Sequence, residues 1–149
     1  MKIAQIAALI ESVPPRLYGG TERIVSYLTE ELVIQGHDVT LFASGNSLTS
    51  AKLVPCCPHA LRLDPTVRDT IPYYMLMLKK VREMASRFDV LHFHIDQFHF
   101  PLFSGTSSRT VTTLHGRQDL PDLKPLYAGF PGMAARVGIG GAAHSDRQR

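Results

Sequence analysis

Short apolar segments alternate with segments of helical periodicity along most of the chain, and this alternation limits the possible folds more than any other feature. A chain that repeats strand and helix in this order is typical of parallel βαβ units. The first apolar run, residues 2–9 (KIAQIAAL), has no helix-capping residue and is suited to a buried parallel strand. The sequence therefore predicts an α/β protein built on a parallel sheet.

The other elements follow from the same patterns. Thr21 is expected to cap a helix that extends to Gln35, because apolar residues recur at helical spacing and Gly36 provides the stop. The further predicted strands are residues 39–43, 51–54, 89–94 and 110–115. The further predicted helices are residues 73–88, which follow Pro72, residues 96–103 as a short helix or turn, and residues 122–130. Together these elements predict a Rossmann-like parallel sheet flanked by helices.

This pattern ends after Met133. Residues 134–149 (AARVGIGGAAHSDRQR) have no clear period, and residues 136–139 make at best a poor strand. We therefore predict one domain, residues 1–133, followed by an irregular tail, residues 134–149.

The charge and the apolar content exclude several classes of protein. The formal net charge is +3, but the last sixteen residues contain three Arg and one Asp, so residues 1–133 carry only +1. Lys and Arg form no stripe, and nucleic-acid binding is not predicted. No apolar run approaches the roughly 20 residues that a membrane span needs, and we expect a cytoplasmic protein. The adjacent Cys56 and Cys57 fit neither a disulfide nor a zinc spacing, and two buried or half-buried thiols are expected.

Ligands of doubly wound folds bind beyond the carboxyl ends of the strands, and three groups of residues fall there. The first group is Gly19-Gly20-Thr21-Glu22, which opens the first helix. Glycines allow the backbone to approach a ligand closely, and a helix N-terminus offers free N–H groups to a phosphate. A flexible turn with a helix cap is the alternative. Neither the Gly-x-Gly-x-x-Gly fingerprint nor a Gly-x-x-x-x-Gly-Lys phosphate loop is present.

The second group is His92-Phe93-His94-Ile95-Asp96 at the end of the third long strand. Its His-x-His-x-Asp pattern resembles the zinc-binding run of metallo-β-lactamases, so a metal-dependent hydrolase that uses His92, His94 and Asp96 is an alternative. Gln97 stands where that family has His, and the later His ligands are missing. We therefore expect no metal, and we expect His94 and Asp96 to bind hydroxyl groups.

The third group is His115-Gly116, at the tip of the strand over residues 110–115. An imidazole in this position can donate a hydrogen bond to a hydroxyl group or to a phosphate oxygen near neutral pH. A strand-end histidine in solvent is the alternative.

In their order along the chain, these pieces resemble the N-terminal domain of bacterial family 4 glycosyltransferases, which have the two-domain GT-B architecture. The resemblance covers residues 1 to about 133. The residues that carry it are KIAQIA at 2–7, YGGTER at 18–23, LTEEL at 28–32, GHDVTLFA at 36–43, DVLHFH at 89–94 and TLHG at 113–116.

The resemblance implies an enzyme that moves a sugar from a nucleotide-sugar donor to an acceptor, with retention of configuration and without a required metal or cofactor. It implies that both substrates bind at an interdomain cleft. His115 would contact the transferring sugar as the catalytic residue, and Gly19 and Gly20 would lie against the donor diphosphate or the acceptor. The expected substrate contacts also include Thr21, Glu22, His94, Asp96 and Gly116.

The family's second domain holds most of the nucleotide, and nothing in residues 1–149 matches it. We therefore expect the chain alone to be inactive. It would be one subunit of a split glycosyltransferase that pairs with a separate donor-binding half, or a non-catalytic relic. Back-translation of residues 134–149 with a one-base shift can encode Leu-Val-Ser-Ala-Ser and then Gln-Arg, as the family has. A frameshift that truncates a longer enzyme is therefore a further expectation.

Overall fold

Six strands pair side by side in one sheet, and every pair is parallel. The computed structural model describes residues 1–134 and 137–139. The strand order in the sheet is β3-β2-β1-β4-β5-β6. The strands are β1 (Lys2–Ile6), β2 (Asp38–Ser44), β3 (Lys52–Cys57), β4 (Val90–Phe93), β5 (Thr110–Leu114) and β6 (Val137–Ile139). The predicted α/β, Rossmann-like parallel sheet is confirmed.

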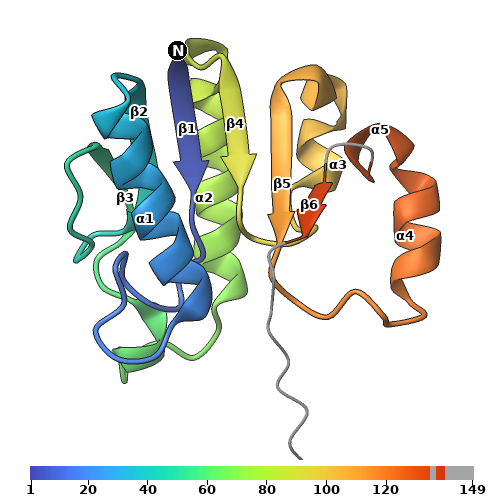
Figure 1. The fold of residues 1–149 in the computed structure, drawn as a ribbon. Helices are drawn as coiled ribbons and strands as arrows, with labels where there is room; N and C mark the ends of the chain where they lie inside the picture. The colour runs from blue at the N-terminus through green and yellow to red at the C-terminus, as the bar shows by residue number, and fades with distance from the viewer. Residues whose placement is uncertain (135–136, 140–149) are drawn as a thin grey trace, which may run out of the picture.

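Helices cover both faces of this sheet (Figure 1). The α-helices are α1 (Gly20–Ile34), α2 (Ile71–Met84), α3 (Phe100–Phe103), α4 (Leu123–Gly129) and α5 (Pro131–Ala134). Three short 3-10 helices are η1 (Leu61–Leu63), η2 (Ala85–Arg87) and η3 (Ser104–Arg109). None of the helices in the described part of the chain is both long enough and apolar enough to cross a membrane.

The alternation of side chains along β1 divides the core into two clusters. Ala4 and Ile6 belong to the larger cluster, together with Met77 and Val81 of α2. Ala7, directly after β1, belongs to the smaller cluster with Val25 of α1. Because successive side chains of a strand point to opposite faces, Gln5 lies on the α1 face. It is a fully buried polar residue within an apolar strand.

Several predicted boundaries differ from the structure. The strand predicted over residues 2–9 ends at Ile6, because the backbone at Leu9 turns toward other elements: its N–H donates to the Tyr74 hydroxyl and its carbonyl accepts from Leu61. The helix over residues 73–88 begins at Ile71 and continues as η2 after Met84. The poor strand expected at 136–139 is β6, which pairs with β5. The sheet therefore continues past residue 133, and the domain boundary placed there stays a prediction.

One core histidine makes the stability of the fold depend on pH. His99 has no exposed surface, and its ring stacks on Phe93 with the centroids 3.8 Å apart. Nε2 is 2.9 Å from the Thr112 hydroxyl, whereas Nδ1 has no hydrogen-bond partner in the described part of the chain. Burial lowers the pKa of His99 from 6.5 to about 3. The unfolded chain therefore binds a proton at His99 between about pH 6.5 and pH 3 that the folded protein does not.

We expect the free energy of unfolding to be highest above pH 6.5 and to fall as the pH decreases toward 3. At pH 5, His99 alone should account for a loss of about 2 kcal/mol. In the variant His99→Phe, which keeps a ring against Phe93, the loss between pH 8 and pH 5 should be smaller by about that amount. Urea unfolding curves at a series of pH values measure both slopes. Equal slopes for the two proteins would contradict the assignment of this pH dependence to His99.

Candidate functional site

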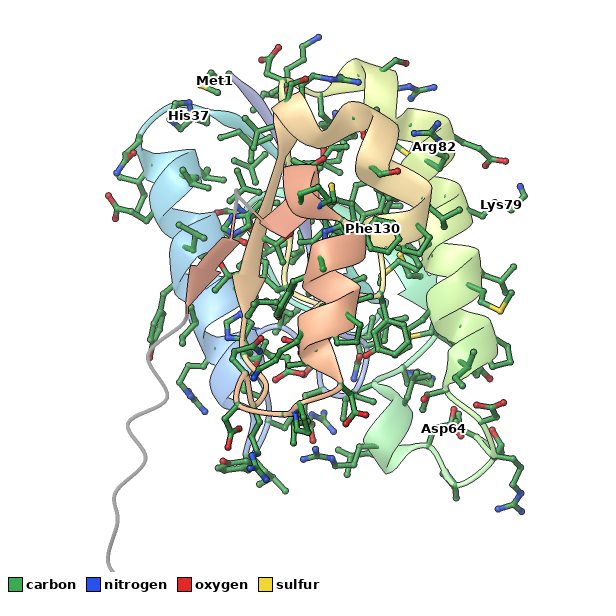
Figure 2. The ribbon with its side chains drawn as sticks, turned by 90° about the vertical axis from the view of Figure 1, so that its right-hand side faces the viewer. Met1, His37, Asp64, Lys79, Arg82 and Phe130 are labelled. Atoms are coloured by element: carbon green, nitrogen blue, oxygen red, sulfur yellow. The ribbon has the colours of Figure 1, made fainter. Side chains whose placement is uncertain are left out.

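The three residue groups that follow predicted strands lie at one edge of the sheet. The strands β1, β4 and β5 are neighbours and parallel, so their carboxyl ends meet at the same edge. Gly19 and Gly20 close the loop after β1, Asp96 follows β4, and His115 follows β5. Figure 2 shows Met1 and His37 at one end of the domain and Asp64, in a loop beyond the carboxyl end of β3, at the other.

The loop between β1 and α1 is fixed by contacts with its neighbours. The N–H of Val13 donates to the Ser47 hydroxyl at 2.9 Å, and the Val13 carbonyl accepts from Leu48 at 2.8 Å. The buried carboxylate of Glu11 pairs with Arg62 at 3.0 Å. These contacts hold the middle of the loop before α1 against the segments that follow β2 and β3.

The two glycines of this loop have different surroundings. Gly19 is the N-cap of α1, and Gly20 is the first helical residue, so the prediction that Thr21 caps the helix is wrong: Thr21 lies inside the first turn. A Cβ atom on Gly19 would lie 2.7 Å from Cβ of Pro15 and 3.0 Å from a carboxylate oxygen of Glu22. A Cβ atom on Gly20 would meet no described atom within 4 Å. Packing therefore requires glycine at position 19, whereas space is open at position 20.

Glu22 occupies the N-terminal turn of α1 as a buried acid, with 5% of its surface exposed. Burial raises the pKa of Glu22 above its ordinary value, and the negative charge of Glu11 adds to the rise. The backbone N–H groups of Glu22 and Glu11 and the charge of Arg62 oppose it. A carboxyl group thus already uses part of the helix N-terminus that the sequence assigned to a phosphate.

Asp96 joins the end of β4 to the end of β5. Its Oδ1 accepts hydrogen bonds from the backbone N–H groups of His115 at 2.9 Å and of Gly116 at 3.1 Å. Asp96 has a φ of 51°, a left-handed conformation that Asp adopts more readily than most residues. A Cβ atom on Gly116 would lie 3.0 Å from Asp96 Oδ2, so the turn fits tightly around the carboxylate. Asp96 therefore positions His115.

Five polar side chains form a continuous row of hydrogen bonds on the α1 face, which we name the histidine chain. They come from β1, β4 and β5 and from the residues directly after β4 and β5. It begins at the Thr113 hydroxyl, 2.8 Å from His92 Nε2, and passes from His92 Nδ1 to Gln5 Nε2 at 3.4 Å. It continues from Gln5 Oε1 to His94 Nε2 at 2.8 Å and ends with His94 Nδ1 and His115 Nε2, 3.1 Å apart. His115 is half-buried at the edge of the sheet.

The three imidazoles of the histidine chain are held neutral. Burial lowers the pKa of His92 to about 4 and lowers that of His94 well below its ordinary value of 6.5. Burial also lowers the pKa of His115, although the Asp96 carboxylate opposes the shift. A proton on any one of these rings would repel a proton on the next, so the chain carries no charge at neutral pH.

The arrangement does not favour the metallohydrolase alternative. Both ring nitrogens of His92 and both of His94 have hydrogen-bond partners, and Oδ1 of Asp96 holds two backbone N–H groups. Within residues 1–134 and 137–139, no group of three or more His, Cys, Asp or Glu side chains is arranged to hold a metal ion.

The predicted thiols are half-buried at Cys56 and buried at Cys57, and both are free. Burial raises the pKa of Cys56 to about 12 and that of Cys57 to about 11, with the charge of Asp64 adding to the second. Neither thiol forms a reactive thiolate at neutral pH.

Three features of this edge are not among the predicted site residues. The first is Gln5, for which a polar residue in the middle of the run KIAQIAAL is the signal in the sequence. Tyr74 of α2 accepts the Leu9 N–H at 3.0 Å and stacks on Phe98, and no pattern in the sequence indicated it. A depression of about 260 Å³ also lies between the loops after β1, β2 and β3, with Arg16 and His59 in its lining.

Comparison with known proteins identifies the class. Residues 18–139 match the family described as Glycosyltransferase Family 4, and the chain belongs to that family. This span includes the diglycine turn, the histidine chain from His92 onward and β6. No curated protein sequence matches this chain.

Solved structures give the same fold. The crystal structure of AviGT4, a glycosyltransferase involved in avilamycin A biosynthesis, aligns with a TM-score of 0.51 and 21% sequence identity. The alignment covers 77% of this chain and 32% of AviGT4, so the chain spans about a third of the length of that protein. At this identity the likeness concerns the fold alone.

The different surroundings of the two glycines lead to a prediction on stability. Gly19→Ala should destabilise the protein by about 1–3 kcal/mol, because the new methyl group overlaps Pro15. Gly20→Ala should leave stability unchanged or raise it by up to about 1 kcal/mol, because the methyl group meets no atom and the unfolded chain loses freedom. Urea unfolding midpoints of the two variants and of the unmodified protein measure these changes in stability. A larger loss for Gly20→Ala than for Gly19→Ala would be inconsistent with this geometry.

Proposed function

We propose that this chain forms the acceptor-side wall of the cleft of a retaining glycosyltransferase, which transfers a sugar from a nucleotide-sugar donor to an acceptor. The observation that carries the proposal is the meeting of the α1 N-terminus and His115 at one edge of a parallel sheet, in a chain of glycosyltransferase family 4. Ligands of such sheets bind at this edge.

His115 is the residue that we propose to contact the transferring sugar. Its backbone N–H is held by Asp96 and its ring by His94, so the imidazole has little freedom to rotate. A ring that is already oriented loses little entropy when a substrate binds. His94, Asp96 and Gly116 then serve by holding His115 in place, in addition to any contact of their own with a hydroxyl group.

Gly20 supports a close approach of the donor diphosphate or the acceptor to the start of α1, because the space beside its backbone is open. Thr21 and Glu22 belong to the same helical turn and are the proposed neighbours of that group. Glu22 limits the proposal: a phosphate beside its buried carboxyl group would favour the protonated acid, since two negative charges repel. No metal or cofactor has a role in this proposal.

A second, donor-binding wall is required for efficient transfer. A donor that contacts one wall stays largely in water, and its leaving diphosphate meets few preorganised hydrogen-bond donors. A split glycosyltransferase, in which a separate chain provides the second wall, is one form of this proposal, and a non-catalytic relic is the alternative.

We expect the 149-residue polypeptide on its own to release no nucleoside diphosphate above background from UDP-, GDP- or ADP-sugars. Coupled detection of the released diphosphate measures this directly. Turnover by the polypeptide alone would contradict the need for a second wall. Turnover that appears only when a donor-binding domain of the family is added would favour a split enzyme over a relic.

Binding can be tested without turnover. In protein labelled with 15N-histidine, titration with nucleotide-sugars should shift the ring resonances of His115 and leave those of His37 unchanged, because His37 lies at the opposite edge (Figure 2). Gly20→Ala should weaken this response without a loss of stability, because its methyl group fills the space beside the helix start. Shifts at His37 alone, or an unaltered response in Gly20→Ala, would count against the proposed site.

A further inference from the structure

Gln5 stands at the centre of the histidine chain and uses both ends of its amide. It has no exposed surface and lies opposite His92 in the register between β1 and β4. Its Oε1 is 2.8 Å from Nε2 of His94, and its Nε2 is 3.4 Å from Nδ1 of His92. Among the described residues, the hydrogen bonds of this amide join it to His92 and His94.

The amide differs in one respect from every other member of the histidine chain. A neutral imidazole carries one N–H and one lone pair, and the proton can sit on either nitrogen. A threonine hydroxyl can also donate or accept. The amide oxygen of Gln5 can only accept and its NH₂ group can only donate, so the orientation of Gln5 sets the direction of every bond in the row.

The amide of Gln5 fixes the position of the proton on each imidazole of the histidine chain. Because Oε1 accepts, Nε2 of His94 carries the proton and Nδ1 of His94 is left with its lone pair. Nε2 of His115, 3.1 Å away, must then donate to that lone pair. On the other side the amide donates to Nδ1 of His92, and Nε2 of His92 donates to the Thr113 hydroxyl.

We propose that Gln5 is a positioning residue that fixes His115 as the tautomer with its proton on Nε2, so that Nδ1 of His115 presents a lone pair to the substrate. Nδ1 has no hydrogen-bond partner among the residues that the structure describes. In this tautomer His115 accepts a hydrogen bond, and the group that it recognises is a hydroxyl, as on a sugar, in preference to a phosphate oxygen. The substrate contact rests on the function proposed above, whereas the tautomer does not.

The burial that keeps the three rings neutral supports this assignment, because a doubly protonated ring would have no lone pair to accept a bond. The ring of His94 is also held at both nitrogens, by the amide oxygen of Gln5 at Nε2 and by the imidazole of His115 at Nδ1. The ring is 2% exposed, so water cannot replace either partner without opening the sheet.

Nitrogen NMR of the full chain tests the proposal. Protonated and unprotonated ring nitrogens give separate 15N resonances, so a long-range proton–nitrogen spectrum at pH 8 reports the tautomer of each histidine. In the unmodified protein we expect His115 to carry its proton on Nε2. A proton on Nδ1 of His115, or equal populations of the two tautomers, overturns the proposal, and this result needs no variant to fold.

Variants then test the role of Gln5 itself. In Gln5→Leu, His94 loses its acceptor, and we expect the single tautomer of His115 to give way to a mixture or to the form with a proton on Nδ1. Gln5→Met, which has an unbranched chain of the same length, serves if the leucine variant does not fold. An unchanged His115 tautomer in a folded variant overturns the proposal.

Thr113→Val is the matched control, since it removes one polar group from the far end of the same row. It removes the partner of His92 Nε2 but leaves the Gln5 amide in contact with both His92 Nδ1 and His94 Nε2. We therefore expect the His115 tautomer to stay as in the unmodified protein. If Thr113→Val changes the tautomer population of His115 as much as Gln5→Leu does, the cause is a general loss of order in the histidine chain. That result would overturn the role of Gln5. Because these spectra contain no substrate, a failed nucleotide-sugar titration with the expected tautomers rejects only the proposed function.

Discussion

Parallel pairing of all strands is the constraint on which the site depends. It places every carboxyl end at one edge, so groups that are far apart in sequence meet after β1, β4 and β5. The central position of β1 puts its polar residue, Gln5, beside β4, and the carboxylate of Asp96 then fastens β4 to the turn after β5. An antiparallel strand at either place would send its carboxyl end to the opposite edge and separate His115 from the start of α1.

A row of polar side chains inside a sheet is stable only when the donors and acceptors match. A buried polar group without a partner costs about 1–3 kcal/mol, and a buried charge costs more. The histidine chain meets this condition by staying neutral and by pairing each ring nitrogen of His92 and His94. His99 meets it only in part, because Nδ1 has no partner in the described chain. His99 therefore leaves one buried ring nitrogen unpaired, whereas His92 and His94 have a hydrogen-bond partner at both ring nitrogens.

The start of α1 combines two opposing features. A helix N-terminus attracts negative charge, and the space beside Gly20 is open. The buried Glu22 already lies in the first turn, however, and burial raises its pKa. A diphosphate at this place would therefore favour uptake of a proton by Glu22, so that binding and protonation would be linked. His115 would not repel a negatively charged ligand in this way, since its ring is neutral. Its backbone N–H donates a hydrogen bond to Asp96.

The sequence by itself determined the order of strands and helices, the parallel sheet and the edge at which Gly20, Asp96 and His115 lie, because apolar periodicity and turn residues are local signals. Only the tertiary structure decided what these residues do for one another. Gln5 and His94 are 89 positions apart, and Asp96 and His115 are 19 apart, so their contacts depend on strand register. The difference between Gly19 and Gly20 has the same origin. The two residues are of the same type, and they differ in the folded protein because Pro15 packs against Gly19 and not against Gly20.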